Sequence, residues 1–287
     1  MRLVVRRFSA EGPHLDTFVP LCRSHPKDPE LTVYVKGFLA PCESPSDFSA
    51  FTRAHGRLQT ERGWGPRAHG YTWEKGQLSV PVPVAKFALP IPVATISHVL
   101  WSLWTKGRIL RIASGGAAVA LVAAELTFSM VQIVTQYFAC RASLDAQAKV
   151  LAAKLRRLMS VYRTVRLVGH SMGCALIVKT LQELEPWELA ELECHLLAPA
   201  VLSDDCVLVF PELKSCTVYY TPNDWVLAAL FGILHLSESI GTAGARGLCR
   251  DLDVSSVFGA LSVHREFPSK FPEMLALAER RKTLDKS

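Results

Sequence analysis

A glycine-flanked turn, Gly169-His170-Ser171-Met172-Gly173, separates two apolar stretches of different character. The stretch before it, residues 164–168 (TVRLV), is short and rich in β-branched residues, which predicts a buried strand. The stretch after it, residues 174–184 (CALIVKTLQEL), has the length and apolar content of a packed helix. Helices that alternate with short apolar strands cover the faces of a parallel sheet, so the pattern predicts an α/β fold with a mostly parallel sheet flanked by helices.

The same alternation recurs along the chain. Further strands are predicted at residues 2–8, 31–35, 69–73, 192–197, 216–220 and 248–254. Helices are predicted at residues 44–55, from Ser143 onward with that serine as the cap, and at 272–281. At 287 residues, the chain is predicted to be a single domain, 1–287. Ligands of such sheets bind at the carboxyl ends of the strands.

Residues 78–142 interrupt this pattern and are predicted to form an apolar helical insert or cap within the domain. Prolines alternate with apolar residues in VPVPVAKFALPIPV, and Glu125 is the only charge between Ile112 and Cys140. About 20 apolar residues can cross a bilayer, and basic residues flank the run on both sides. Glu125 and two glutamines are costly in lipid, however. A buried or membrane-interface helix and a true membrane span therefore both stay open.

Composition excludes several classes of protein. Hydrophobic residues make up 49% of the chain and charged residues 20%, which does not fit a disordered protein. Lysine and arginine exceed aspartate and glutamate by 32 to 26, a net charge of +6, but the basic residues are scattered. We therefore expect no nucleic-acid partner, whereas an anionic membrane surface stays possible.

The eight cysteines suggest neither a metal site nor a disulfide framework. They form no CxxC pair and no cysteine–histidine spacing suited to zinc, and the histidines and carboxylates show no HExxH spacing. We expect no metal and no cofactor, and mostly buried thiols in a reducing compartment. The N-terminal sequence MRLVVRRFSAEGPHLD has no run typical of a secretory signal peptide, so a cytoplasmic or membrane-associated location is expected.

Ser171 is the predicted nucleophile. The flanking Gly169 and Gly173 are needed because a serine in a tight strand-to-helix turn leaves no room for side chains beside it. A serine hydroxyl requires a histidine base, and that base requires a carboxylate to orient it. In enzymes built on this turn the chain order is serine, acid, histidine, and Asp224 and His264 fit that order, each just after a predicted strand.

Other acids and histidines of the chain are alternatives for these roles. Asp204 and Asp205, which follow the predicted strand 192–197, are the alternative acids. His170 is expected to shape the turn, His195 to be a core residue, and His235 lies close after Asp224 in an apolar run.

Acyl transfer also needs an oxyanion hole, two backbone N–H groups that converge on the developing negative charge. Met172, directly after the nucleophile, would donate one of them. Phe38, in the loop after strand 31–35, is the predicted second donor, with Leu39 as its alternative.

These motifs together resemble the α/β-hydrolase superfamily. The resemblance rests on VRLVGHSMGCALI, LTVYVKGF, YYTPNDWVL and the late histidine, and it spans most of residues 30–285 apart from the insert. More loosely, VKGFLAPCESPSDF, GYTWEKG and YYTPNDWVLA look like the transmembrane-and-coiled-coil-domain family of lipase-like proteins, whose members join such a core to membrane-associated segments. The early loop departs from the HGGG pattern of many esterases, because Lys36 precedes Gly37.

The sequence thus predicts a serine hydrolase that cleaves carboxylic esters through an acyl-enzyme. The apolar insert favours a lipid or another apolar ester as the substrate, since insertions of this kind can cap a pocket. Two alternatives stay open: a membrane-associated binding or scaffold protein that keeps the fold without turnover, and a thioesterase or peptidase with the same triad.

Overall fold

The computed structural model describes residues 18–22, 28–38, 44–73, 116–202, 212–235, 237–245, 249–259 and 263–284. Within helices, the side chains of residues 116–135, 229–230, 232–234 and 282–284 are outside this description. The predicted strand at 2–8 and residues 78–115 of the predicted insert lie outside the described residues, as do Leu39, Asp204 and Asp205. The chain divides into two compact units, one of residues 1–37, 41–73 and 144–287, and one of residues 38–40 and 74–143. The second unit contains residues 78–142 of the predicted insert. The single domain 1–287 with this insert stays a prediction.

The described residues of the first unit form a seven-stranded sheet with the order β1-β3-β2-β4-β5-β6-β7. The strands are β1 (Phe18–Pro20), β2 (Glu30–Val35), β3 (Ala68–Tyr71), β4 (Thr164–His170), β5 (Leu192–Leu197), β6 (Ser215–Tyr220) and β7 (Arg250–Asp253). All neighbours are parallel except β1, which pairs antiparallel with β3. The predicted α/β fold with a mostly parallel sheet is therefore confirmed. Most residues of the central strands β2, β4 and β5 are buried, as expected for a parallel sheet with helices on both faces.

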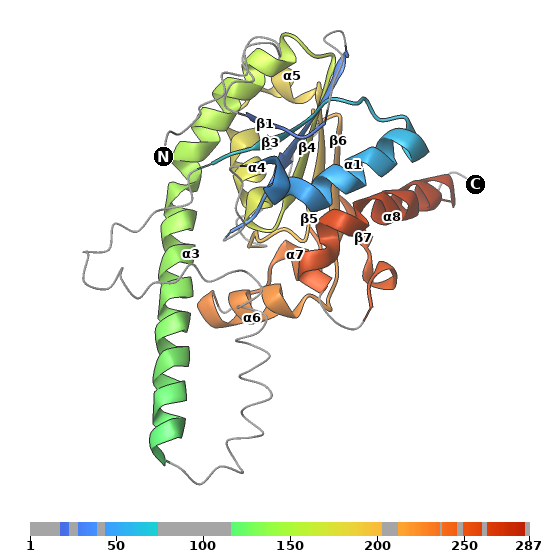
Figure 1. Cartoon of the computed structure of the whole chain (residues 1–287). Helices are drawn as coiled ribbons and strands as arrows, with labels where there is room; N and C mark the ends of the chain where they lie inside the picture. Colours follow the sequence, from blue (N-terminus) through green and yellow to red (C-terminus); the bar gives the residue numbers. More distant parts are fainter. Residues whose placement is uncertain are drawn as a thin grey trace. The chain divides into compact units, whose positions relative to one another are not determined.

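Helices cover the two faces of this sheet. The helices of the described residues are η1 (Pro45–Phe48), α1 (Ser49–Arg62), α3 (Gly116–Met159), α4 (Met172–Gln182), α5 (Pro186–Leu189), α6 (Trp225–Leu234), α7 (Ile240–Ala243), η2 (Ser255–Val257) and α8 (Val263–Leu284). Figure 1 shows α1 and α8 on one face, with α4 and residues 144–159 of α3 on the other. Tyr34 of β2 packs on Phe51 of α1, with ring centroids 4.7 Å apart.

Two predicted helix starts are wrong. The helix expected to begin at Ser143 is the continuation of α3, and the Ser143 hydroxyl donates to the backbone oxygen of Cys140 at 2.8 Å instead of capping an end. A serine that bonds back to the preceding turn is tolerated inside a helix. The helix expected at 272–281 begins earlier, at Val263, with Pro268 and Pro272 inside it. Neither proline marks the start of the helix. Each proline removes only one helical hydrogen bond, and the helix continues past it.

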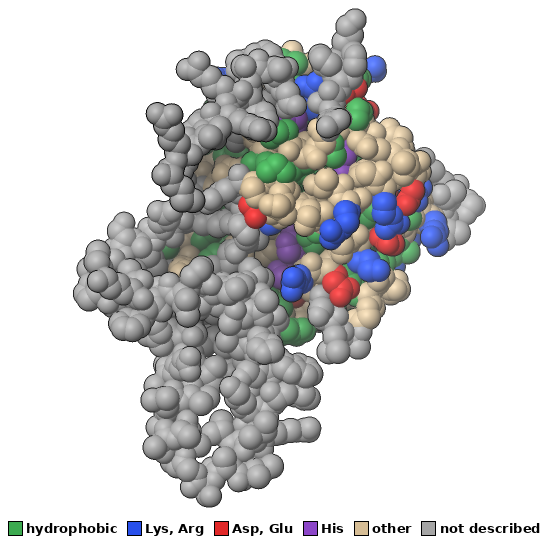
Figure 2. Space-filling view, in the orientation of Figure 1, with side chains coloured by type: hydrophobic (Ala, Val, Ile, Leu, Met, Phe, Trp, Pro, Cys, Tyr) green, Lys and Arg blue, Asp and Glu red, His purple; other side chains and the backbone are tan. Residues whose placement is uncertain are grey.

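Exposed ion pairs join α1 to α8. Arg57 bonds Glu61 on its own helix at 2.9 Å and Glu273 of α8 at 2.8 Å, while Arg62 reaches Glu279 at 2.5 Å. Figure 2 shows basic and acidic side chains interspersed over this side of the molecule. Such mixed surface charge contributes little to stability and provides no basic stripe for a nucleic acid.

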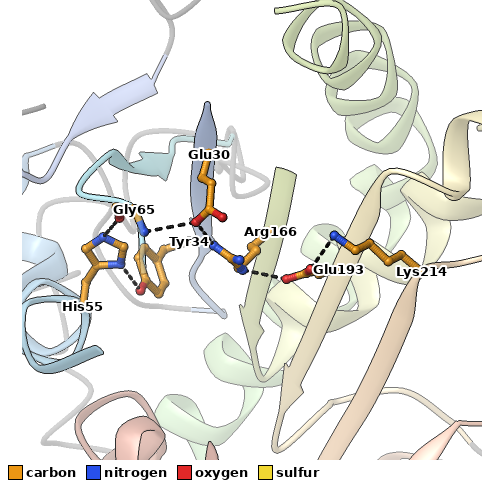
Figure 3. Close-up of polar contacts among 7 residues, drawn as sticks. All are labelled: Glu30, Tyr34, His55, Gly65, Arg166, Glu193 and Lys214. Carbon is orange, nitrogen blue, oxygen red and sulfur yellow. Dashed lines mark hydrogen bonds and ion pairs between the residues drawn. The ribbon is translucent and has the colours of Figure 1, made fainter. Parts of the chain in front are cut away.

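A partly buried charge network joins the amino ends of the strands (Figure 3). Arg166 of β4 lies between Glu30 of β2 at 2.7 Å and Glu193 of β5 at 2.6 Å. Lys214, just before β6, bonds the other oxygen of Glu193 at 2.8 Å. The Arg166 guanidinium also stacks over the Trp64 ring, 4.8 Å from its centroid. Because Ser171 follows the carboxyl end of β4, this network lies at the opposite end of the sheet from the predicted chemistry.

Among the described residues of the second unit, α3 continues from Gly116 to Ser143. Tyr137 is buried, and its ring meets the Phe38 ring edge-on with centroids 5.9 Å apart. Within the described part of the chain, no helix is long and apolar enough to cross a bilayer. The side chains of residues 112–135, most of the predicted apolar run, are outside the described part of the chain. The buried or membrane-interface helix and the membrane span therefore both stay predictions.

Candidate active site

Ser171 occupies a strained turn between β4 and α4. Its backbone angles, φ 56° and ψ −125°, lie in a region that residues with a side chain rarely adopt. Backbone bonds to the β5 side hold it there, because Ser171 N donates to Leu197 O at 3.0 Å and Ala200 N donates to Ser171 O at 3.1 Å. Ala198, between those two partners, also has a positive φ of 44°. No feature of the sequence predicts this second strained residue.

Close packing explains both glycines of the turn. A Cβ on Gly173 would lie 2.3 Å from the backbone oxygen of Val35, at the end of β2. A Cβ on Gly169 would lie 2.8 Å from the Cδ1 atom of Ile177 on α4. The Gly173 contact is with backbone, which cannot give way, so α4 can approach β2 this closely only without a side chain at that position.

The loop after β2 lies against the same turn. A Cβ on Gly37 would be 2.7 Å from the Ser171 Cβ and 3.3 Å from Met172 N. Met172 N is the first predicted oxyanion donor, so this loop is within contact distance of it. Phe38, the second predicted donor, belongs to the second unit, and Met172 to the first. The pairing of these two N–H groups therefore stays a prediction.

Asp224 and His264 are brought together from two distant segments. Asp224 Oδ2 accepts a hydrogen bond of 2.6 Å from His264 Nδ1. The Asp224 side chain is fully buried, and that of His264 is 15% exposed. His264 Nδ1 carries the hydrogen that it donates to Asp224. His264 Nε2 is therefore the ring nitrogen that can accept a proton.

The turn that carries Asp224 is itself fixed by hydrogen bonds. Asp224 is the N-cap residue of α6, and its Oδ1 accepts from Leu227 N at 3.1 Å. Thr221 Oγ1 bonds Ser255 Oγ at 2.7 Å and accepts from Asn223 N at 3.2 Å. One carboxylate oxygen thus caps a helix while the other orients His264. These two hydrogen bonds together hold the Asp224 side chain in its orientation.

His170 holds the backbone of His264. His170 Nε2 donates to the His264 carbonyl oxygen at 2.9 Å, and the two imidazole rings lie 4.8 Å apart. That carbonyl is available because its helical partner would be the N–H of residue 268, which is a proline. His170 is adjacent to Ser171, so this bond brings His264 beside the turn. The sequence indicated that His170 shapes the turn but did not reveal its bond to the histidine.

The charges around His170 favour its neutral form. Burial, followed by the nearby imidazole of His264 and then by Lys36, holds the pKa of His170 well below its usual range, against the effect of its bond to the His264 carbonyl. Lys36 turns its ammonium toward η1, where Nζ donates to Asp47 O at 2.5 Å and lies over the Phe48 ring. A neutral His170 donates through Nε2 without placing a second positive charge beside His264.

The alternative residues lie elsewhere. His195 is buried on β5, where Nδ1 bonds the Tyr219 hydroxyl at 3.0 Å, as the core interpretation predicted. His235 follows α6 and packs on the Phe231 ring. Cys174, three residues after Ser171, is buried, and burial raises the pKa of its thiol. Among residues whose positions are described, no cluster of histidine, cysteine or acidic side chains could hold a metal.

Comparison with known proteins adds no further evidence. Neither family models, nor curated proteins, nor solved structures give a match to this chain. Chemical interpretation therefore rests on the geometry. A serine in a strained turn, a histidine with one ring nitrogen tied to a buried carboxylate, and strand-end loops around both are the elements required for nucleophilic acyl transfer.

Proposed function

We propose that this protein is a serine hydrolase of the α/β-hydrolase type that cleaves carboxylic esters through an acyl-enzyme. The observation that carries the proposal is the 2.6 Å bond between His264 Nδ1 and the buried Asp224, formed beside the strained turn of Ser171. A buried carboxylate bonded to a histidine fixes the tautomer that a general base needs. Its place at the carboxyl ends of parallel strands is where ligands of such sheets bind.

The proposed reaction runs in two halves. Ser171 Oγ attacks the ester carbonyl while His264 Nε2 takes its proton, and Asp224 stabilises the imidazolium that forms. The backbone N–H of Met172, with that of Phe38, stabilises the oxyanion. His264 then protonates the departing alcohol, and the same groups activate a water that releases the acid from Ser171.

A lipid or another apolar ester is the proposed substrate class. Its support is the composition of residues 78–142, a largely apolar segment inserted between β3 and β4 that largely coincides with a separate compact unit. Insertions at the carboxyl ends of strands can cap a pocket with their own chemistry. The same segment supports a membrane-associated location as part of the proposal.

Ester hydrolysis by defined variants tests the proposal. Ser171→Ala, His264→Ala and Asp224→Asn should each lower kcat/KM for p-nitrophenyl esters by roughly a thousandfold or more, because the three groups act as one unit. Asn at 224 can still accept the hydrogen bond from Leu227 N and cap α6, so the loss would reflect the lost charge. Activity on octanoyl against acetyl esters measures the apolar preference.

Matched variants make the result specific. His235→Ala removes the nearest rival histidine in the sequence, and Asp145→Asn removes the charge of an aspartate on α3, which pairs with Lys179 at 2.7 Å. Both should keep activity within a few-fold of the parent chain. Loss of turnover in His235→Ala but not in His264→Ala would move the base to residue 235, and full turnover by Ser171→Ala would refute the mechanism.

A further inference from the structure

Three thiols lie in a row across neighbouring strands, at the end of the sheet opposite to Ser171. Cys194 of β5 is opposite Cys216 of β6 in the strand register. Thr217 of β6 is opposite Arg250 of β7. One residue earlier on each strand, Cys216 is therefore opposite Cys249, which directly precedes β7. In a parallel sheet, opposite residues project from the same face, so all three side chains share one face.

Cys216 and Cys249 differ from Cys194 in their surroundings. Both are half-buried and reachable by solvent, whereas Cys194 is fully buried. The thiols of Cys216 and Cys249 are in hydrogen-bond contact, and this bond lowers the pKa of the Cys249 thiol against the effects of burial and of Asp251. Burial strongly raises the pKa of the Cys194 thiol, which stays protonated and inert.

We propose that Cys216 and Cys249 form a reversible disulfide when the protein meets a hydroperoxide. Neighbouring strands lie about 4.8 Å apart, within the Cα separation that disulfides span. Cys249 directly precedes β7, at the amino end of that strand. The bridge would be a modification site separate from the proposed active site.

The chemistry balances with the hydroperoxide as the oxidant. The Cys249 thiolate attacks the distal peroxide oxygen, the O–O bond breaks, and a sulfenic acid forms together with hydroxide or an alkoxide, which takes up the proton that the Cys249 thiol had released. The Cys216 sulfur then attacks the sulfenic sulfur, the S–S bond forms, and water leaves with the Cys216 proton. Overall, two thiols lose two electrons and two protons, and the hydroperoxide is reduced to water and water or alcohol.

The bridge would close the chain between β6 and β7, a loop that contains Asp224 and α6. Closing such a loop restricts the unfolded chain and stabilises the folded one. We therefore expect the oxidised protein to unfold at a higher temperature than the reduced protein, by roughly 5 °C. Because the two thiols lie at the amino ends of the strands, this measurement does not depend on the proposed hydrolase activity.

Differential alkylation of the full chain tests the pair. In reduced protein at pH 7, iodoacetamide should modify Cys249 roughly tenfold faster than Cys22, a half-buried cysteine whose thiol pKa is raised by burial. After exposure to hydrogen peroxide, free thiols are blocked with light N-ethylmaleimide, and the protein is reduced and labelled with the heavy reagent. Peptide mapping should then find heavy label on Cys216 and Cys249 in equal amounts.

Two variants decide the pairing. Cys216→Ser should stop oxidation of Cys249 at the sulfenic acid and abolish the rise in unfolding temperature, whereas Cys194→Ala should change neither result. Heavy label shared between Cys249 and a cysteine other than Cys216 would overturn the proposal. Oxidation of Cys22 while Cys216 and Cys249 stay reduced would also overturn it. So would heavy label on Cys249 and a second cysteine in equal amounts in Cys216→Ser.

Discussion

The backbone carbonyl of His264 is the residue-scale feature on which the site depends. Pro268 deprives it of its helical donor, and His170 Nε2 bonds it at 2.9 Å. A missing hydrogen bond in a helix is therefore compensated by the residue that precedes the proposed nucleophile. We infer that His170 acts as a positioning residue for His264.

A double-variant cycle tests this positioning. His170→Phe removes the donor and keeps a ring, so kcat for ester hydrolysis should fall about tenfold with KM little changed, as expected for one lost hydrogen bond. Pro268→Ala restores an N–H in α8 that can bond the His264 carbonyl. The double variant His170→Phe with Pro268→Ala should therefore recover most of the lost kcat. Strictly additive losses in the two variants would show that they do not act through this carbonyl.

At the scale of the elements, Arg166 joins β2, β4 and β5 at their amino ends. The hydrogen bond that Glu30 accepts from Arg166 lowers the pKa of Glu30. The pKa of Glu193 is also lowered, because bonds with Lys214 and Arg166 outweigh its burial. Both carboxylates thus remain charged, and removing the arginine would leave two negative charges on β2 and β5, the strands on either side of β4.

Arg166→Met should lower the free energy of unfolding by about 2 kcal/mol, because partly buried carboxylates lose their partner. Arg57→Met, which breaks only exposed ion pairs, should cost no more than about 0.5 kcal/mol. Urea unfolding measures both values. Equal effects of the two substitutions would mean that the network does not support the sheet.

Much of the element order could be predicted from sequence because the signals are local. Residues 192–197 form a strand with the predicted bounds, and residues 31–35 and 216–220 lie in strands one residue longer. β1 was missed, since three residues (FVP) carry too little periodicity. The early start of α8, which puts His264 in a helix instead of a loop, could not be predicted, because it depends on His170 supplying a donor from another strand.

The candidate site was partly predictable for the same reason. The glycine-flanked turn singled out Ser171, and chain order with a place just after a predicted strand singled out Asp224 and His264. The structure brings the last two into contact. The strain at Ala198 could not be predicted, since it depends on contacts between loops. The predicted partnership of Phe38 with Met172 depends on how the two units meet, which local sequence does not encode.

At the scale of the whole molecule, buried neutral histidines link stability to pH. His55 bonds the Tyr34 hydroxyl at 2.9 Å and Gly65 O at 3.1 Å, and burial lowers its pKa to about 4. Burial likewise lowers the pKa of His195 to about 4. In the unfolded chain both would titrate near pH 6.5, so between these values unfolding takes up protons.

Stability should therefore be full above pH 6.5 and fall on acidification toward pH 4, by about 1.4 kcal/mol per pH unit for each of these two histidines. Urea unfolding between pH 6.5 and 5 measures this slope, above the range in which carboxylates titrate. A variant with His55→Gln and His195→Gln should show a flatter dependence. An unfolding free energy that stays constant from pH 6.5 to 5 in the parent chain would contradict this account.

The most direct test of the central claim is labelling of the full chain by a fluorophosphonate probe, in buffer and in detergent. The probe reacts covalently only with an activated serine. We predict that the parent chain and Ser160→Ala, which removes an exposed serine after α3, are labelled, whereas Ser171→Ala is not and His264→Ala reacts far more slowly. Folded parent protein that takes no label, or label that persists in Ser171→Ala, would contradict the assignment of Ser171 as an activated nucleophile.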